Sequence, residues 1–200
     1  MWIRILIAGI AGGVLVFVTG AFSHAALGLQ GRTIENLPDE ATFVEQVKGQ
    51  KLRHGLYGFP GQPTSKDAKE REREFAEVQK RFKAGPAGFL LIAPTGEEMM
   101  GGATLGMEFA TNAIAALLAA WILSLAAADV GFGKRWLAVL AMGIFAWFSL
   151  SASYGIWYRF PHDFIHDEFY CAVLEWGVAG LAIAAIVRKP IQPAQGTKHE

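Results

Sequence analysis

Four long apolar stretches constrain the fold of this chain more than any other feature of its sequence. A helix that crosses a bilayer core of about 30 Å needs roughly 20 apolar residues. Stretches of about this length occupy residues 3–27, 103–128, 136–157 and 169–187. We therefore predict a mainly α fold built around a four-helix transmembrane bundle.

The first of these stretches also has features of a cleaved signal peptide. Arg4 precedes a long apolar run, and the small residues around Ser23 follow it. The apolar part, 5–22, is nevertheless longer than the roughly 7–15 residues typical of such a peptide. We therefore predict that residues 1–27 form a retained transmembrane helix, and that residues 101–189 contain the second to fourth.

The charged residues are concentrated in one segment. Residues 28–100 hold 11 of the 18 Lys and Arg and 11 of the 18 Asp and Glu, although charged residues make up only 18% of the chain. This segment has two helical patterns, at 36–49 and 64–86, and two apolar stretches bounded by Gly and Pro, at 54–61 and 88–96. We predict a small α/β cap, residues 28–100, inserted between the first and second transmembrane helices.

Capping residues suggest where the two cap helices begin. Pro38 suits the first turn of the first helix, because its ring fixes a helical φ and the amide there needs no partner. Thr64 or Ser65 suits the N-cap of the second helix. The glycines at 49 and 85 predict where the two helices end.

Basic residues near the ends of the spans predict the topology. Short cytoplasmic flanks carry an excess of Lys and Arg. An inside N-terminus places five basic residues in such flanks: Arg4, Lys134, Arg135, Arg188 and Lys189. We predict a multi-pass protein of the bacterial inner membrane with both termini cytoplasmic, residues 28–100 extracytoplasmic, and a disordered cytoplasmic tail at 190–200.

Polar residues within the spans gather in their predicted outer halves. The candidate ligand-binding residues are His24, Glu108, Asn112, Ser149, Ser153, Tyr154 and Glu175. At 100° per residue they share helix faces with glycines and alanines, which mark helix contacts in lipid, and Gly9-x-x-x-Gly13 predicts such a close contact on the first span. This pattern predicts a polar pocket that opens outward. Its groups either hydrogen-bond within the bundle or form a site in which Glu108, Glu175 and His24 handle protons or a small ligand.

Two histidines raise the question of a metal site. His162 and His166 are four residues apart, so one helical face could present both to a metal. Further ligands are not evident, and the acidic residues around them also suit the beginning of a helix. Cys171 is the only cysteine, which excludes an internal disulfide and a CxxC redox pair. The sequence implies no particular cofactor.

Several function classes lack support in the sequence. It contains no HExxH, GxSxG or Walker motif. Its 18 basic and 18 acidic residues give no net charge, and hence no reason to expect nucleic acid as a partner. Whether the chain is an enzyme is left open.

Several segments resemble a known group of proteins. They are NLPDE, GLYGFPG, KAGPAGFLLIAPTGE, TNAIAALLAA and SASYGIWYRFP. With them the chain, from Gly9 to Arg188, resembles an uncharacterised family of bacterial four-span integral membrane proteins. The resemblance implies a membrane protein and brings no activity, ligand or site residue with it.

Two functions are therefore expected from the sequence. The first is a non-catalytic accessory or scaffolding subunit of an inner-membrane or envelope complex, whose partners are membrane lipids and another membrane or envelope protein. The alternative is a protein that binds a lipid, quinone or similar amphiphile in the outward pocket, with Glu108 and Glu175 as proton-handling groups. Transport is less well supported, because the inner halves of the spans are almost without polar residues.

Overall fold

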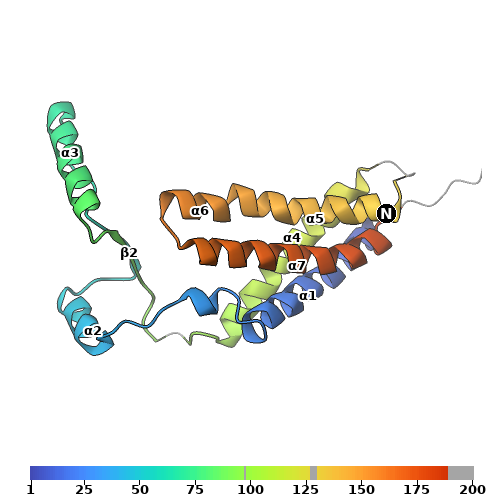
Figure 1. Ribbon diagram of the computed structural model, residues 1–200. Helices are drawn as coiled ribbons and strands as arrows, with labels where there is room; N and C mark the ends of the chain where they lie inside the picture. Colours follow the sequence, from blue (N-terminus) through green and yellow to red (C-terminus); the bar gives the residue numbers. More distant parts are fainter. Residues whose placement is uncertain (97, 127–129, 189–200) are drawn as a thin grey trace, which may run out of the picture. The chain divides into compact units, whose positions relative to one another are not determined.

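The computed structural model describes residues 1–96, 98–126 and 130–188 of the chain (Figure 1). These residues are mainly helical and divide into two compact units. The first comprises Met1–Ile34, Met100–Gly155 and the chain from Phe160 onward, and the second comprises Glu35–Met99 with Ile156–Arg159. The tail predicted at 190–200 lies outside the described residues. The segment 28–34, predicted as part of the cap, belongs to the first unit.

Four helical stretches of the described chain are long and apolar enough to cross a membrane, which confirms this part of the predicted fold, and all but the last two residues of the third belong to the first unit. They are α1 (Trp2–Ala25), α4 (Gly102–Ser124), α5 (Phe132–Ser149) with α6 (Ser151–Trp157), and α7 (His162–Ile186). Many large apolar side chains on these helices are exposed, as expected of surfaces that face lipid.

Helix α1 packs between α4 and α7, and α5 packs on α7 (Figure 1). Glycines allow the close approach of α1 and α4. A Cβ added at Gly13 would lie 2.5 Å from Cα of Ala113, and one added at Gly9 would lie 2.9 Å from Cα of Leu117. The Gly9-x-x-x-Gly13 pattern therefore works as the sequence predicts, by bringing two backbones together.

Glycines and tryptophans also join α7 to α5. A Cβ at Gly143 would lie 2.4 Å from the ring of Trp176, so only glycine fits there. The indole nitrogen of Trp136 donates a hydrogen bond to the Gly177 carbonyl at 2.8 Å. The interior between these helices is small and aliphatic, with Val139 and Ile183 as its largest fully buried apolar side chains.

Three of the spans differ from the predicted ones, and the second ends at Ser124 rather than at 128. The third begins at Phe132 rather than at 136, and Leu150 interrupts it between α5 and α6. Next to this break the Ser151 hydroxyl donates a hydrogen bond to the Glu168 side chain of α7 at 3.2 Å. The fourth apolar stretch, predicted at 169–187, continues a helix that begins at His162, where the acidic residues suit a helix start as the sequence indicates.

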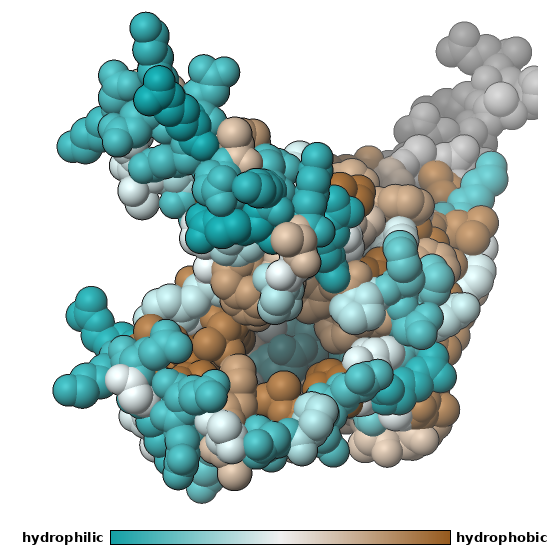
Figure 2. Space-filling view, turned by 60° about the vertical axis from the view of Figure 1, so that its left-hand side comes forward, coloured by the Kyte–Doolittle hydropathy of each residue, from teal (hydrophilic) through white to brown (hydrophobic). Residues whose placement is uncertain are grey.

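The second unit contains α2 (Glu40–Gly49), β1 (Gly55–Phe59), α3 (Ala68–Ala84) and β2 (Gly88–Ile92). The strands pair antiparallel, with Leu56 opposite Leu91, as the two Gly- and Pro-bounded stretches indicate. Phe89 packs edge-on against Tyr158, with ring centroids 5.2 Å apart. The outer surface of α3 is mostly hydrophilic (Figure 2).

The predicted starts of both cap helices are wrong. Pro38 precedes α2, and the Asp39 side chain accepts the Thr42 amide. The N-cap of α3 is Asp67, whose side chain accepts the Glu70 amide at 3.0 Å. An aspartate accepts these amides as well as Ser or Thr does, and its negative charge also suits the positive end of the helix.

Candidate functional site

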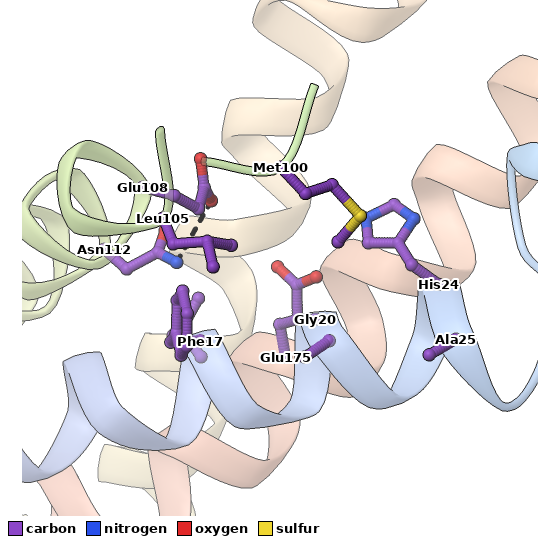
Figure 3. A pocket seen from close by; sticks show the side chains of 11 residues that line it. Phe17, Gly20, His24, Ala25, Met100, Leu105, Glu108, Asn112 and Glu175 are labelled. Atoms are coloured by element: carbon purple, nitrogen blue, oxygen red, sulfur yellow. Dashed lines mark hydrogen bonds between the residues drawn. The ribbon is translucent and has the colours of Figure 1, made fainter. Parts of the chain in front are cut away.

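A pocket of about 440 Å³ lies in the first unit, between α1, α4 and α7 (Figure 3). Its walls are mostly apolar and include Val16, Phe17, Leu105 and Met100. Four of the predicted site residues line it with them: His24, Glu108, Asn112 and Glu175. The volume falls within the range of about 300–1,000 Å³ that is usual for small-molecule sites.

The packing of the helices brings Glu175 and Glu108 to a similar level. Phe17 of α1 lies edge-on to Phe109 of α4, with centroids 5.9 Å apart, next to Glu108. Three residues further along α1, a Cβ at Gly20 would lie 3.0 Å from Oε1 of Glu175. Gly20 lies five residues before Ala25, the last residue of α1, which is about 8 Å along the helix axis at 1.5 Å per residue. The two carboxylates therefore share one layer of the bundle.

Glu175 is half-buried, and its carboxylate points into the pocket (Figure 3). Among the described residues no hydrogen-bond donor and no cation pairs with it. Gly20, which has no side chain, leaves room for its carboxylate beside α1. A carboxylate removed from water is stable only with a donor, a cation or a proton to compensate it. Glu175 is therefore the group in this pocket that lacks a protein partner.

Glu108 and Asn112 form a pair on α4. The Asn112 amide nitrogen donates to Oε1 of Glu108 at 3.1 Å, across one helical turn (Figure 3). Glu108 is exposed and Asn112 is partly buried. The pair leaves the second carboxylate oxygen of Glu108 and the carbonyl oxygen of Asn112 as acceptors.

His24 lies near the end of α1 and is exposed. Its Nδ1 is 3.4 Å from the carbonyl oxygen of Leu29. A carbonyl can only accept, so Nδ1 is the donor of this long contact, and in the neutral ring Nε2 is an acceptor.

Three predicted site residues do not line the pocket. Ser149 is exposed, Ser153 is partly buried, and Tyr154 is 39% exposed and stacks on Phe160 with centroids 6.0 Å apart. All three belong to α5 and α6. Because α5 packs on α7, whereas α1, α4 and α7 bound the pocket, the structure does not bring these residues to it.

The structure also contains a charged contact that sequence reasoning missed. Asp167 of α7 is fully buried, and its carboxylate accepts hydrogen bonds from Nε of Arg32 at 2.9 Å and from Nη2 of the same side chain. The backbone amide of Gln30 donates to Oδ2 of Asp167 at 2.9 Å. The hydrogen bond to Asp167 raises the pKa of the Arg32 guanidinium, which keeps it charged.

Glu168 extends this contact. It accepts hydrogen bonds from the Gln30 side-chain amide and from the Ser151 hydroxyl, the latter at 3.2 Å. The segment 28–34, with the 3-10 helix η1 (Gly31–Thr33), is thereby fixed to α7. One sequence signal was available: Asp167 precedes Cys171 by four residues and Glu175 by eight, on the face that meets the other helices.

The predicted metal site gains no further ligand. His162 and His166 are both exposed. Among the described residues, no group of three His, Cys, Asp or Glu side chains is placed to hold a metal ion. Cys171 is buried with its thiol unpaired in any disulfide.

Comparisons with known proteins find no relative of this chain: no family model, no curated protein and no solved structure matches it. The resemblance to bacterial four-span membrane proteins therefore stays a prediction. Function has to be argued from the geometry of the site.

Proposed function

We propose that this chain is a multi-pass membrane protein that binds an amphiphile, a lipid, a quinone or a similar molecule, in the pocket between α1, α4 and α7. One observation carries the proposal: Glu175 is half-buried in a mostly apolar pocket and has no partner among the described residues. Intramembrane acids of this kind generally mark functional sites. The apolar walls suit a hydrocarbon tail, and the layer of Glu108 and Glu175 suits a polar head.

The two carboxylates suit proton handling as well as binding. They come from different helices, α4 and α7, and face the same cavity. Carboxylates are among the side chains that accept and return protons when positioned against a reacting group, and these two can do so on one bound molecule. In this proposal a bound head group exchanges a proton with Glu175 or Glu108.

The proposed location is the bacterial inner membrane, with both termini cytoplasmic. Basic side chains at one end of the first unit support this orientation. Arg4 donates to the Arg188 carbonyl, and Arg135 donates to the Ala184 carbonyl at 3.0 Å. Three arginines therefore gather where α1 and α5 begin and α7 ends, as expected for the cytoplasmic side.

Native mass spectrometry of the protein, gently extracted from its own membrane, tests the proposal. The wild-type chain should retain a small molecule that Glu175→Gln and Glu108→Gln lose. Glu77→Gln on α3, an exposed residue in the second unit, removes the same charge elsewhere and should retain it. A wild-type chain with no bound molecule, or equal retention by all four proteins, would contradict the proposal.

A second candidate is the accessory or scaffolding subunit expected from the sequence. The observation that favours it is a hollow of about 690 Å³ within the second unit, lined by side chains of α2 and of both strands that include Phe43, Tyr57 and Phe89. A partner at this hollow should co-purify in fixed stoichiometry. Phe43→Asp should release it, and Glu175→Gln should leave the complex intact.

A further inference from the structure

We infer that the pocket between α1, α4 and α7 selects an amphiphile whose head is a primary ammonium group. The inference rests on the proposed function and names the class of ligand for that site. Its basis is the chemistry of the polar side chains described along the pocket, which offer mostly acceptors and include neither Lys nor Arg.

The strongest acceptors come from two helices, α7 and α4. Glu175 offers both carboxylate oxygens, because it has no partner among the described residues. Glu108 uses one oxygen on Asn112, at 3.1 Å, and keeps the other. Since Asn112 spends an amide hydrogen on this bond, its carbonyl oxygen is the acceptor that it retains. Four or more acceptor positions therefore surround the cavity.

The remaining polar groups have the same character. His24 directs Nδ1 to the Leu29 carbonyl, so the neutral ring has Nε2 free as an acceptor. The thioether of Met100 is a weak acceptor. A head group that complements such a site is rich in donors and positively charged.

A phosphate or carboxylate head fits poorly, because neither Lys nor Arg is among the described residues that line the pocket. Arg32 is held by the buried Asp167. An anionic head would face two carboxylates without a cation, and like charges at short range repel each other strongly.

An ammonium group matches the acceptors in number and size. It carries three N–H donors and no acceptor. Glu175, Glu108 and Asn112 can each take one of these donors, and the first two form charge-assisted hydrogen bonds. A bare metal ion is a poorer match, because the described residues hold no group of three His, Cys, Asp or Glu side chains placed as ligands. The hydrocarbon tail then lies along Phe17, Val16 and Leu105.

A competition assay with matched tails tests the inference. The full chain is placed in phosphatidylcholine nanodiscs and binds radiolabelled dodecylamine. Unlabelled dodecylamine and lysophosphatidylethanolamine should both compete, whereas dodecanol and dodecyl phosphate should compete at least about tenfold more weakly, as expected for loss of one charge-assisted hydrogen bond. The ratio of the first two separates a free long-chain amine from a lipid head group with the same ammonium chemistry.

Variants tie the preference to Glu175. Glu175→Gln should weaken dodecylamine binding by about tenfold or more and leave dodecanol within about twofold. Gly20→Ala should also weaken it, because the new Cβ would lie 3.0 Å from Oε1 of Glu175 and displace the carboxylate. Gly106→Ala, on α4, is the matched control: nothing lies within 4 Å of its Cβ position, and binding should be unchanged.

Failure of this inference differs from failure of the proposed function. Binding of all four amphiphiles with similar strength, or a preference for dodecyl phosphate, would overturn the inferred preference for an ammonium head group. The proposed amphiphile-binding site would still stand. Binding of none of them overturns both. An ammonium preference that survives in Glu175→Gln would place the recognition elsewhere and also overturn the inference.

Discussion

Arg32 and Asp167 form an ion pair whose two ends have different surroundings. The Asp167 side chain is fully buried, whereas 58% of the Arg32 side chain is exposed. The pair therefore reaches from solvent into the first unit, and Gln30 adds a backbone hydrogen bond to the same carboxylate. Residues 135 positions apart in the sequence are joined at one point, which fixes the segment after α1 to α7.

Replacing Arg32 should destabilise the fold more than replacing both partners. Arg32→Met leaves a buried carboxylate with the Gln30 amide as its remaining donor, and an unpaired buried charge is costly. We expect the midpoint of thermal unfolding in detergent to fall by several degrees, and the double variant Arg32→Met with Asp167→Leu to recover part of this loss. Differential scanning fluorimetry measures both. A double variant less stable than Arg32→Met would contradict this account.

The contact between Gly13 and Ala113 predicts a steric effect. In Gly13→Ala the new Cβ would lie 2.5 Å from a backbone atom of α4, so the helices must separate. Overpacking of this kind costs about 1–3 kcal/mol. In Gly106→Ala the new Cβ would have no atom within 4 Å. This variant should be neutral or stabilising by up to about 1 kcal/mol, because alanine is the better helix former. Unfolding in a graded denaturing detergent compares them, and equal stability of the two variants would contradict the packing.

The parts of the fold that depend on apolar length and small-residue spacing were predictable. The four spans and the Gly9-x-x-x-Gly13 contact follow from local patterns that lipid imposes on any helix. The break at Leu150 was not, because the apolar pattern of 136–157 continues through it without a change. The contact of Ser151 with Glu168 joins residues 17 positions apart, and no local pattern reveals it.

The candidate site was also predictable only in part. His24, Glu108, Asn112 and Glu175 were found from their depth in the spans, and the structure brings them into one pocket. Depth alone does not say which neighbour a helix packs against. Ser149 and Ser153 have the right depth but belong to a span that packs on another side of the bundle, and only tertiary contacts decide this.

Glu74 should titrate at lower pH than an ordinary glutamate. Its Oε2 accepts the amides of Thr64 at 2.8 Å and Ser65 at 3.0 Å, and these bonds lower the pKa of its carboxyl. A lowered folded-state pKa means that the contact stabilises the fold above the ordinary glutamate value, about 4.3, and is lost as the pH falls through the lower one.

Carbon NMR of the Glu74 carboxyl in the full chain measures this pKa. The Thr64 and Ser65 amide signals should shift over the same pH range, and in Glu74→Gln that transition should disappear. A carboxyl that titrates at or above about 4.3 would rule out the hydrogen bonds described here.

Single cysteines can test the orientation in the membrane. Cys171 is buried and is first replaced by alanine, which removes the only native thiol. A cysteine at the exposed Lys69 of α3 should then react with a membrane-impermeant maleimide in spheroplasts, because the proposed topology places the charged segment outside. A cysteine at the exposed Lys134, at the start of α5, should react only after permeabilisation. The basic flank at Lys134 favours the cytoplasmic side, so the reversed pattern would overturn the orientation. Labelling of both sites without permeabilisation would show that the two ends of the bundle do not face different compartments.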